Sequence, residues 1–407
     1  MRQNAVRRAA TGLVLALAVT AGALTAPAHS ATADSATTDR AAAGPADKGR
    51  ATDPAQDALD RIVAAGPPGA AATALRGRHT WNGTAGVADL DTSRPRTADD
   101  RFRAGSITKT LVATVLLQLE AEKRLDLDDS VEKWLPGLIR GKGHHGRHIT
   151  VRQLLQHTSG LPNYTEDKQI LRRLTTDFPE RRYDTFRPEE LVAVALGHKP
   201  DFRPGRGWKY SNTGYVVAGM VIEAVTGRPY AAEVKRRVLK PLGMKSTLLP
   251  GRRTTLPDPA VRHYSTHVGP EPGTAVHDVT EFSPTIAGAA GELVTTGGDI
   301  TRFYRALLRG ELLPPAQQRA MFKAVPVPGA PDHRYGLGVT SQRLSCGVTV
   351  WGHDGGIHGS ASSAAGTRDG RKVLAFNVNG DWSDDPAAGE GLTDVWFCPS
   401  TPAAGRP

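Results

Sequence analysis

The spacing of apolar residues predicts strands near both ends of the chain and helices between them. Ala70–Leu75 and Thr84–Leu90 have the pattern of strands, and the intervening Asn82-Gly83 pair predicts a turn that joins them. Near the other end, a hairpin turn at Asp369-Gly370 accompanies three strand-like runs, which are Gly347–Trp351, Ser360–Ala365 and Val373–Val378. We therefore expect one antiparallel sheet that is built from both ends of the chain.

Helical patterns occupy most of the chain from Ser106 to roughly Ile300. The run Ser106–Glu120 is apolar and long enough to form a buried helix. The other helical patterns are Pro54–Ala65 with Ala58, Ile62 and Val63 as its apolar face, Val151–Gln156 behind a Thr150 cap, Pro188–Leu196, Thr213–Val225, Tyr230–Leu239 and Leu392–Phe397. These patterns predict an α/β (α+β) fold, in which an antiparallel sheet flanked by helices packs against a mostly helical lobe, with a cleft between them.

Length and composition are those of a globular protein with room for two lobes. The chain has 407 residues, and 39% of them are hydrophobic, enough for an ordinary core. The net charge is +10, but the basic residues are spread along the chain rather than clustered. This distribution favours a solvated surface over attraction to an anionic cell wall, and we expect no nucleic acid partner.

The first 30 residues have the layout of a secretory signal peptide. Arg2, Arg7 and Arg8 precede an apolar run that is too short to span a membrane, and small residues around Ala28 offer a cleavage site. No cysteine lies near that site to carry a lipid anchor. We expect a secreted, extracellular protein without a stable membrane anchor, with a disordered linker at 31–53, a folded domain at 54–398 and a short tail at 399–407.

Cys346 and Cys398 are the only cysteines, an even pair in a chain with export features. A disulfide between them would fasten the last helical segment to the strand pattern that contains Cys346. The alternative, two free buried thiols, fits an oxidising compartment less well.

Ser106 and Lys109 place a hydroxyl and an amine three residues apart at the start of the longest helical run. Residues at this spacing share a helical face, so the amine can take the hydroxyl's proton if its pKa falls from about 10.4. The unpaired N–H groups of a first helical turn also favour an oxyanion. A second Ser-x-x-Lys match, Ser130–Lys133, follows a charged run and precedes Pro136, which indicates a solvated cap.

Two later segments supply candidate partners for Ser106. Tyr210 and Asn212 stand between a glycine-rich loop and a helical run. The four residues from His353 to Gly356 follow a strand-like run, and the two glycines among them let a backbone approach a ligand closely. Taken singly, Tyr210, Asn212 and His353 fit a buried tyrosine, a turn asparagine and a strand-end histidine, but in register with Ser106 they favour a catalytic cleft. In chain order the candidates are Tyr210, Asn212, His353, Asp354, Gly355 and Gly356.

In this order the segments resemble the motifs of serine β-lactamases and penicillin-binding proteins. The resemblance is closer to the class C-like branch, which includes secreted D-alanyl-D-alanine carboxypeptidases, esterases and D-aminopeptidases. That branch has Tyr-x-Asn as its second motif and Lys or His, any residue, then Gly as its third. Further matching stretches are Leu154–Pro162, Tyr210–Tyr215, Pro241–Met244 and Tyr335–Gly338. The resemblance covers about residues 55–398 and implies a β-lactamase/transpeptidase-like fold.

The resemblance also implies a role for each candidate. Ser106 is the nucleophile, and Lys109 and Tyr210 share the general-base and general-acid work. Asn212 positions the substrate amide. The backbone N–H groups of Ser106 and Gly356 form the oxyanion hole.

His353 and Asp354 are the positions of the third motif that bear on pH and substrate. His353 lines the opposite wall of the cleft, and a protonated imidazole beside Lys109 is expected to lower the pKa of Tyr210. Because imidazole titrates near 6.5, we expect activity to change between about pH 5 and pH 8. Asp354 replaces the Thr or Ser common in carboxypeptidases and β-lactamases, so it repels a substrate carboxylate unless it points away. Arg343 is the only compensating cation in the stretch that leads to the motif.

The leading hypothesis is an exported serine hydrolase with an acyl-Ser106 intermediate, a D-alanyl-D-alanine carboxypeptidase that acts on peptidoglycan stem peptides. The alternatives are a class C-like β-lactamase, or an esterase or D-aminopeptidase, which differ in how fast water deacylates the enzyme. A non-catalytic penicillin-binding sensor is disfavoured because the motif residues are intact. We expect a monomer that takes a small peptide, ester or β-lactam substrate and needs no cofactor.

A histidine cluster raises the hypothesis of a metal site. His144, His145 and His148 lie close together, but glycines surround them and no carboxylate or cysteine nearby completes a ligand set. A solvated loop without metal is the better interpretation. The chain also lacks a Gly-x-Ser-x-Gly elbow, which argues against the α/β-hydrolase fold.

Overall fold

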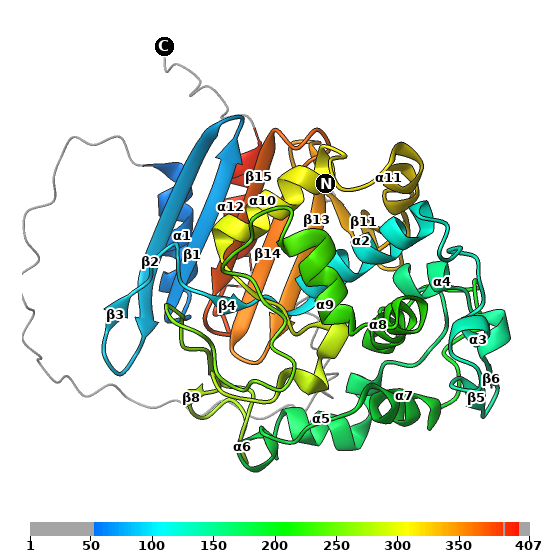
Figure 1. The fold of residues 1–407 in the computed structure, drawn as a ribbon. Helices are drawn as coiled ribbons and strands as arrows, with labels where there is room; N and C mark the ends of the chain where they lie inside the picture. Colours follow the sequence, from blue (N-terminus) through cyan, green and yellow to red (C-terminus); the bar gives the residue numbers. More distant parts are fainter. Residues whose placement is uncertain (1–52, 386, 399–407) are drawn as a thin grey trace, which may run out of the picture.

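The computed structural model describes residues 53–385 and 387–398, and a nine-stranded sheet is its main feature (Figure 1). The strand order is β10-β11-β12-β13-β14-β15-β1-β2-β3. Its strands are β1 (Gly69–Arg76), β2 (His79–Asp89), β3 (Arg94–Pro95), β10 (Val325–Val327), β11 (Ala330–Tyr335), β12 (Thr340–Arg343), β13 (Thr349–Ile357), β14 (Ser360–Thr367) and β15 (Lys372–Val378). β1 pairs antiparallel with β15, which confirms that both ends of the chain build one sheet.

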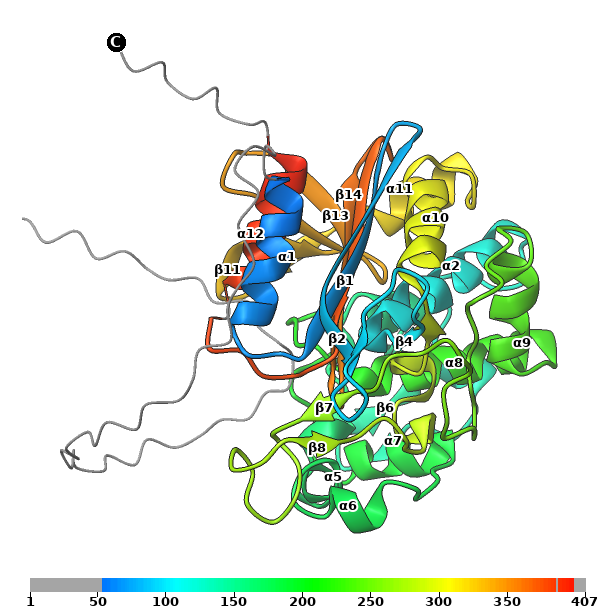
Figure 2. The ribbon, with the colours of Figure 1, turned by 90° about the vertical axis from the view of Figure 1, so that its left-hand side faces the viewer.

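Helices α1 (Pro54–Ala64) and α12 (Ala388–Phe397) cover one face of the sheet, as Figure 2 shows. Ala58, Leu59 and Leu392 are fully buried between these helices and the strands. Asp53 caps α1 by accepting a hydrogen bond from the Ala55 N–H at 3.0 Å. Asp53, the last residue of the expected linker, therefore forms the cap of this helix.

The helical lobe lies on the opposite face of the sheet. α10 (Gly297–Leu308) packs on β1, β14 and β15, and α2 (Thr108–Ala121) is enclosed by other helices, among them α8 (Asn212–Thr226). Leu111, Val115 and Leu116 are fully buried, which explains why α2 has apolar residues on nearly all sides. The expected buried helix is thus confirmed, although it begins at Thr108 rather than Ser106.

Smaller elements complete the lobe. Its other helices are α3 (Val131–Trp134), α4 (Val151–Leu155), α5 (Lys168–Leu174), α6 (Phe178–Arg181), α7 (Pro188–Leu196), α9 (Tyr230–Val234), which continues as a π-helix over Lys235–Leu239, and α11 (Pro315–Met321). Three two-stranded ladders join β4 (Phe102–Arg103) to β9 (Val294–Thr295), β5 (Arg140–Gly141) to β6 (His144–His145), and β7 (Tyr264–Ser265) to β8 (His277–Asp278).

The turn between the first two strands is not where the sequence predicts it. β1 and β2 are joined at Gly77 and Arg78, whereas Asn82 and Gly83 lie inside β2. A Cβ at Gly83 would collide with the side chain of Trp81. The glycine therefore makes room for the tryptophan and does not form a turn.

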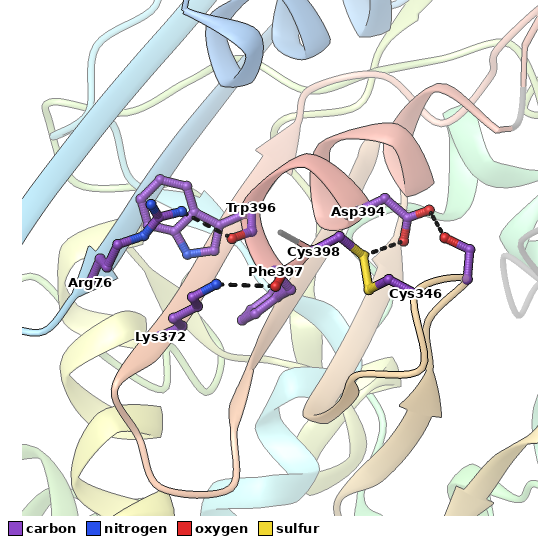
Figure 3. The surroundings of a disulfide bond; sticks show 8 residues. Arg76, Cys346, Lys372, Asp394, Trp396, Phe397 and Cys398 are labelled. Atoms are coloured by element: carbon purple, nitrogen blue, oxygen red, sulfur yellow. Dashed lines mark hydrogen bonds between the residues drawn. A yellow bond between two sulfur atoms is a disulfide. The ribbon is translucent and has the colours of Figure 1, made fainter. Parts of the chain in front are cut away.

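A disulfide bond joins Cys346 and Cys398, as the sequence predicts (Figure 3). Cys346 lies in the turn between β12 and β13, and Cys398 directly follows α12. The end of this helix is also held by Lys372, whose Nζ donates a hydrogen bond to the Phe397 carbonyl at 3.1 Å. The last helix is therefore fastened to the sheet beside the strand of the third motif.

The expected signal peptide, most of the linker and the short tail lie outside the described residues. Among residues 53–385 and 387–398, no helix combines the length and the apolar character needed to cross a bilayer.

Candidate active site

Ser106 lies in a short 3-10 turn, η1 (Gly105–Ile107), which leads into α2. The Ser362 hydroxyl of β14 donates a hydrogen bond to the Ala104 carbonyl at 3.1 Å, which holds the turn against the sheet. Gly105 has a φ of +52°, and a Cβ on it would lie 2.9 Å from the Gly356 nitrogen. Only glycine lets this turn approach β13 so closely.

Lys109 follows one turn later on α2 and is completely buried. Its Nζ lies 2.8 Å from Ser106 Oγ, 2.8 Å from Asn212 Oδ1 and 2.7 Å from the Ala290 carbonyl. Burial lowers the pKa of the Lys109 amine well below its usual value. Asn212 Oδ1 and the Ala290 carbonyl only accept, so they take the two N–H groups of a neutral amine. The lone pair of Lys109 then faces Ser106, as a general base requires.

Tyr210 is the second neighbour of the nucleophile, and its hydroxyl donates to Ser106 Oγ at 2.8 Å. Burial raises the pKa of the phenol above its usual value, and the hydrogen bond to Ser106 offsets only part of this effect. The prediction that Lys109 and His353 lower this pKa is wrong, because burial favours the neutral form of both groups. Tyr210 therefore stays protonated and suits the role of general acid.

Asn212 is the first residue of α8. Its backbone N–H donates to Asn163 Oδ1 at 3.1 Å, and its own Oδ1 contacts Lys109 Nζ. The structure thus gives Asn212 a contact with the base, whereas its role toward a substrate amide stays a prediction.

The edge of β13 beside Ser106 is not paired with another strand. β12 begins at Thr340, which pairs with Gly352, so residues 353–357 lie beyond the ladder and face η1 instead. Alternate residues in a strand direct their backbone N–H and C=O groups to the same edge. Gly352 pairs with β12 at one edge of β13, so the backbone groups of Gly356 point to that same edge. Its N–H therefore points toward η1, consistent with the oxyanion hole that the sequence predicts.

His353 is 4% exposed and hydrogen-bonded on both sides of its ring. Nδ1 donates to the Asp354 carbonyl at 2.6 Å, which leaves Nε2 to accept from the Tyr335 hydroxyl at 2.9 Å. Burial lowers the pKa of His353 to about 3, and the nearby Lys109 adds to the decrease. The expectation that titration of His353 changes activity between about pH 5 and pH 8 is therefore wrong, because this imidazole is neutral throughout that range.

Asp354 points away from the strand face that carries His353. Side chains alternate along a strand, and Trp351 packs with the helical lobe whereas Val350 packs with α1 and α12. Asp354 is therefore on the side of Val350, where it is exposed and lies opposite Ser363. It offers no hydroxyl to the cleft with which to hold a substrate carboxylate.

Arg343, the compensating cation that the sequence suggests, is not beside the third motif. It pairs with Thr349 at the other end of the β12–β13 ladder and is exposed. It therefore cannot balance the charge of a substrate carboxylate in the cleft.

His157 is a residue of the site to which the sequence assigns no role. Its ring centroid lies 4.3 Å from that of Tyr210 and 4.5 Å from that of Tyr335. Its Nδ1 accepts from the Ser211 N–H at 3.2 Å, which fixes the segment that carries Tyr210 and Asn212. Burial lowers its pKa well below the usual value, so the ring is neutral. The available signal is its place in the matching stretch Leu154–Pro162.

The second Ser-x-x-Lys match lies outside the site. Lys133 pairs with Asp129 at 2.6 Å, and its side chain is 55% exposed, as a solvated cap predicts.

The histidine cluster is only partly a solvated loop. His145 and His148 are exposed, but His144 is buried, and its Nε2 lies 2.8 Å from the His198 carbonyl. Across the described ranges, 53–385 and 387–398, no three His, Cys, Asp or Glu side chains are grouped as a metal ion requires.

Comparisons with known proteins extend the match from the site to the whole domain. The family model described as Beta-lactamase matches residues 55–393. Penicillin-binding protein 4* of Bacillus subtilis is 27% identical over 328 residues, which are 74% of this chain and 69% of that protein. Esterase EstB of Burkholderia gladioli is 36% identical over 43% of this chain and 45% of its own length.

Two solved structures are similar over nearly their full lengths. A D-stereospecific amidohydrolase from Streptomyces sp. is 52% identical with a TM-score of 0.80, covering 85% of this chain and 98% of that one. The D-amino acid amidase from Ochrobactrum anthropi SV3, complexed with D-phenylalanine, is 31% identical with a TM-score of 0.74, covering 84% and 97%. The expected fold is thus confirmed, and the chain belongs to the Beta-lactamase family as a serine hydrolase.

Proposed function

We propose that this protein is a D-stereospecific amidohydrolase that cleaves amide or ester bonds of D-amino-acid residues through an acyl-Ser106 intermediate. The observation that carries the reaction type is the buried Lys109 amine, 2.8 Å from Ser106 Oγ, together with the Tyr210 hydroxyl at the same distance from that oxygen. The substrate class is supported by 52% identity to the Streptomyces D-stereospecific amidohydrolase.

Acylation follows from these contacts. Neutral Lys109 takes the proton of Ser106, and Oγ attacks the carbonyl carbon of the scissile bond. The N–H groups of Ser106 and Gly356 stabilise the oxyanion, and Tyr210 gives its proton to the leaving amine or alcohol. Proton transfer from Lys109 restores Tyr210. Water then attacks the ester carbon, releases the acid and returns a proton to Ser106.

The surroundings of the third motif support a substrate with a neutral leaving group. Recognition of a terminal carboxylate needs a cation or hydroxyl donor, and position 354 is an aspartate that points away from the cleft. Lys209, the neighbour of Tyr210, is bound by Glu166 at 2.8 Å and Asp201 at 2.9 Å. A D-alanyl-D-alanine carboxypeptidase acting on peptidoglycan stem peptides is therefore the second candidate, favoured by the likeness to penicillin-binding protein 4*.

Export belongs to the same proposal. The disulfide between Cys346 and Cys398 suits an oxidising compartment, and the first 30 residues have the pattern of a signal peptide. Detection of the mature protein in the culture medium with the signal peptide removed tests this part, and a precursor that stays inside the cells contradicts it.

Two matched substrate pairs test the proposed specificity. The first is D-phenylalanine amide against its L enantiomer, and the second is an acyl-D-Ala-D-Ala peptide against the same peptide with an amidated C-terminus. We expect kcat/KM to favour the D enantiomer and the amidated peptide, each by about a hundredfold, and Ser106→Ala to abolish turnover. Faster cleavage of the free-carboxylate peptide would assign the second candidate instead.

A further inference from the structure

A hollow of about 560 Å³ lies at the end of the sheet remote from Ser106. It is formed by the β1–β2 turn, the β14–β15 turn and the last turns of α10, which Figure 1 shows together. The catalytic turn contacts β14 at Ser362, whereas this hollow lies beyond the end of β14 at Thr367. At the rise of a strand, the two places are more than about 15 Å apart.

Four arginines line this hollow, which we call the arginine cavity: Arg78, Arg305, Arg309 and Arg371, together with Gly77, Asp369 and Gly370. Arg305 is half-buried, and the other three arginines are exposed. Arg309 pairs with Glu311 at 3.0 Å and Arg371 with Asp369 at 3.6 Å. Within the part of the chain that the structure describes, the guanidinium groups of Arg78 and Arg305 have no ion pair or hydrogen bond.

Asp369 is the only carboxylate among the lining residues, and it is hydrogen-bonded within the β14–β15 turn. Its Oδ1 accepts from the Thr367 hydroxyl at 2.6 Å and from the Arg371 N–H at 3.0 Å. These bonds lower the pKa of Asp369, so it is charged but committed to the turn. The cavity therefore keeps an excess of positive charge.

Backbone contacts hold the three segments around the cavity. The Gly77 N–H donates to the Arg371 carbonyl at 2.8 Å, which joins the two turns. Gly370 has a φ of +64°, and a Cβ there would lie 2.6 Å from Arg309 Cγ and 3.0 Å from the Arg305 carbonyl. The β14–β15 turn thus rests directly on α10, and the arginines share one space because the backbone is fixed.

The charge pattern favours an anion between these groups. Arg305, in the last turn of α10, and Arg309, its C-cap, are four residues apart, a spacing at which like charges weaken a helix. The helix dipole offsets part of this repulsion near the C-terminus. It does not account for Arg78 and Arg371, which face the same cavity from two other segments.

We infer that the arginine cavity binds a compact anion that carries more than one phosphate group. Guanidinium groups form two parallel hydrogen bonds with phosphate oxygens, and three segments present them from different directions. The volume is many times that of a water molecule, about 30 Å³, so it has room for more than a single small ion. Free pyrophosphate and a short phosphodiester chain both offer this chemistry. The inference does not depend on the proposed amidohydrolase function.

Calorimetric titration of the full chain at low ionic strength tests this site. The probes are pyrophosphate, a glycerol phosphate oligomer and citrate, which carries a comparable charge without phosphate. The variants are Arg305→Gln and the exposed Arg78→Gln, with Arg319→Gln as the control because it removes an exposed arginine of α11 outside the cavity. An unchanged melting temperature shows that each variant is folded.

We expect saturable binding of a phosphate probe to the wild type and to Arg319→Gln, and about tenfold weaker binding to each cavity variant. The tighter of the two phosphate probes identifies the source of the ligand. Equal affinity in the cavity variants, equal weakening in Arg319→Gln, citrate binding as tight as the phosphate probes, or no saturable binding would each overturn the inference.

Discussion

Replacing His353 by glutamine removes one titrating group and is expected to change how stability depends on pH. In the folded protein the pKa of His353 is about 3, whereas an imidazole in the unfolded chain titrates near about 6.5. Between these values the unfolded state binds one more proton than the folded state. Stability is therefore fully present above about pH 6.5 and falls by about 1.4 kcal/mol per pH unit as the pH decreases through this window.

The free energy of unfolding in urea at pH 4 and pH 6 measures this effect. From pH 6 to pH 4, the wild type is expected to lose about 2.5 kcal/mol more than His353→Gln, whose side chain still accepts a hydrogen bond from Tyr335. An NMR titration of the His353 ring should show no midpoint between about pH 5 and pH 8. Equal losses in the two proteins, or a midpoint in that range, would refute the reasoning.

Three further substitutions test other parts of the fold and site. Replacing Cys346 and Cys398 by serine removes a disulfide that closes a loop of 52 residues and should lower the free energy of unfolding by about 4 kcal/mol. An unchanged free energy of unfolding would contradict this prediction. Gly105→Ala pushes η1 away from Gly356 and should slow acylation about a hundredfold, whereas a normal rate would contradict the oxyanion assignment. His157→Phe leaves the Ser211 N–H unpaired, so it should lower the free energy of unfolding by about 1–3 kcal/mol and lower kcat. Wild-type values of both quantities would contradict the positioning role of His157.

Local patterns explain what the sequence predicts well. The apolar run of α2 has no polar face, so its burial follows from composition alone. The strand patterns near both ends predict strands that pair in one sheet. The family resemblance predicts that residues 106, 109, 210 and 353 form one site, and in the structure these residues lie close together.

The remaining features depend on packing that no local pattern records. Asn82-Gly83 has the composition of a turn, but the space needed by Trp81 places the glycine inside β2. The pKa of His353 depends on burial and on the charge of Lys109, which is far away in the sequence. The direction of Asp354 follows from its position along β13 relative to Val350, and that register is known only from the assembled sheet.

The acylation rate of Lys109→Ala tests most directly whether a neutral Lys109 activates Ser106. Time-resolved intact-mass spectrometry with a D-amino-acid ester follows the acyl-enzyme in the wild type, in Lys109→Ala and in Lys133→Ala, the matched control from the second Ser-x-x-Lys segment. We predict a rate about a hundredfold to ten-thousandfold lower for Lys109→Ala, and a wild-type rate for Lys133→Ala. The wild-type rate should fall with decreasing pH as Lys109 becomes protonated. Near-normal acylation of Lys109→Ala would contradict the account.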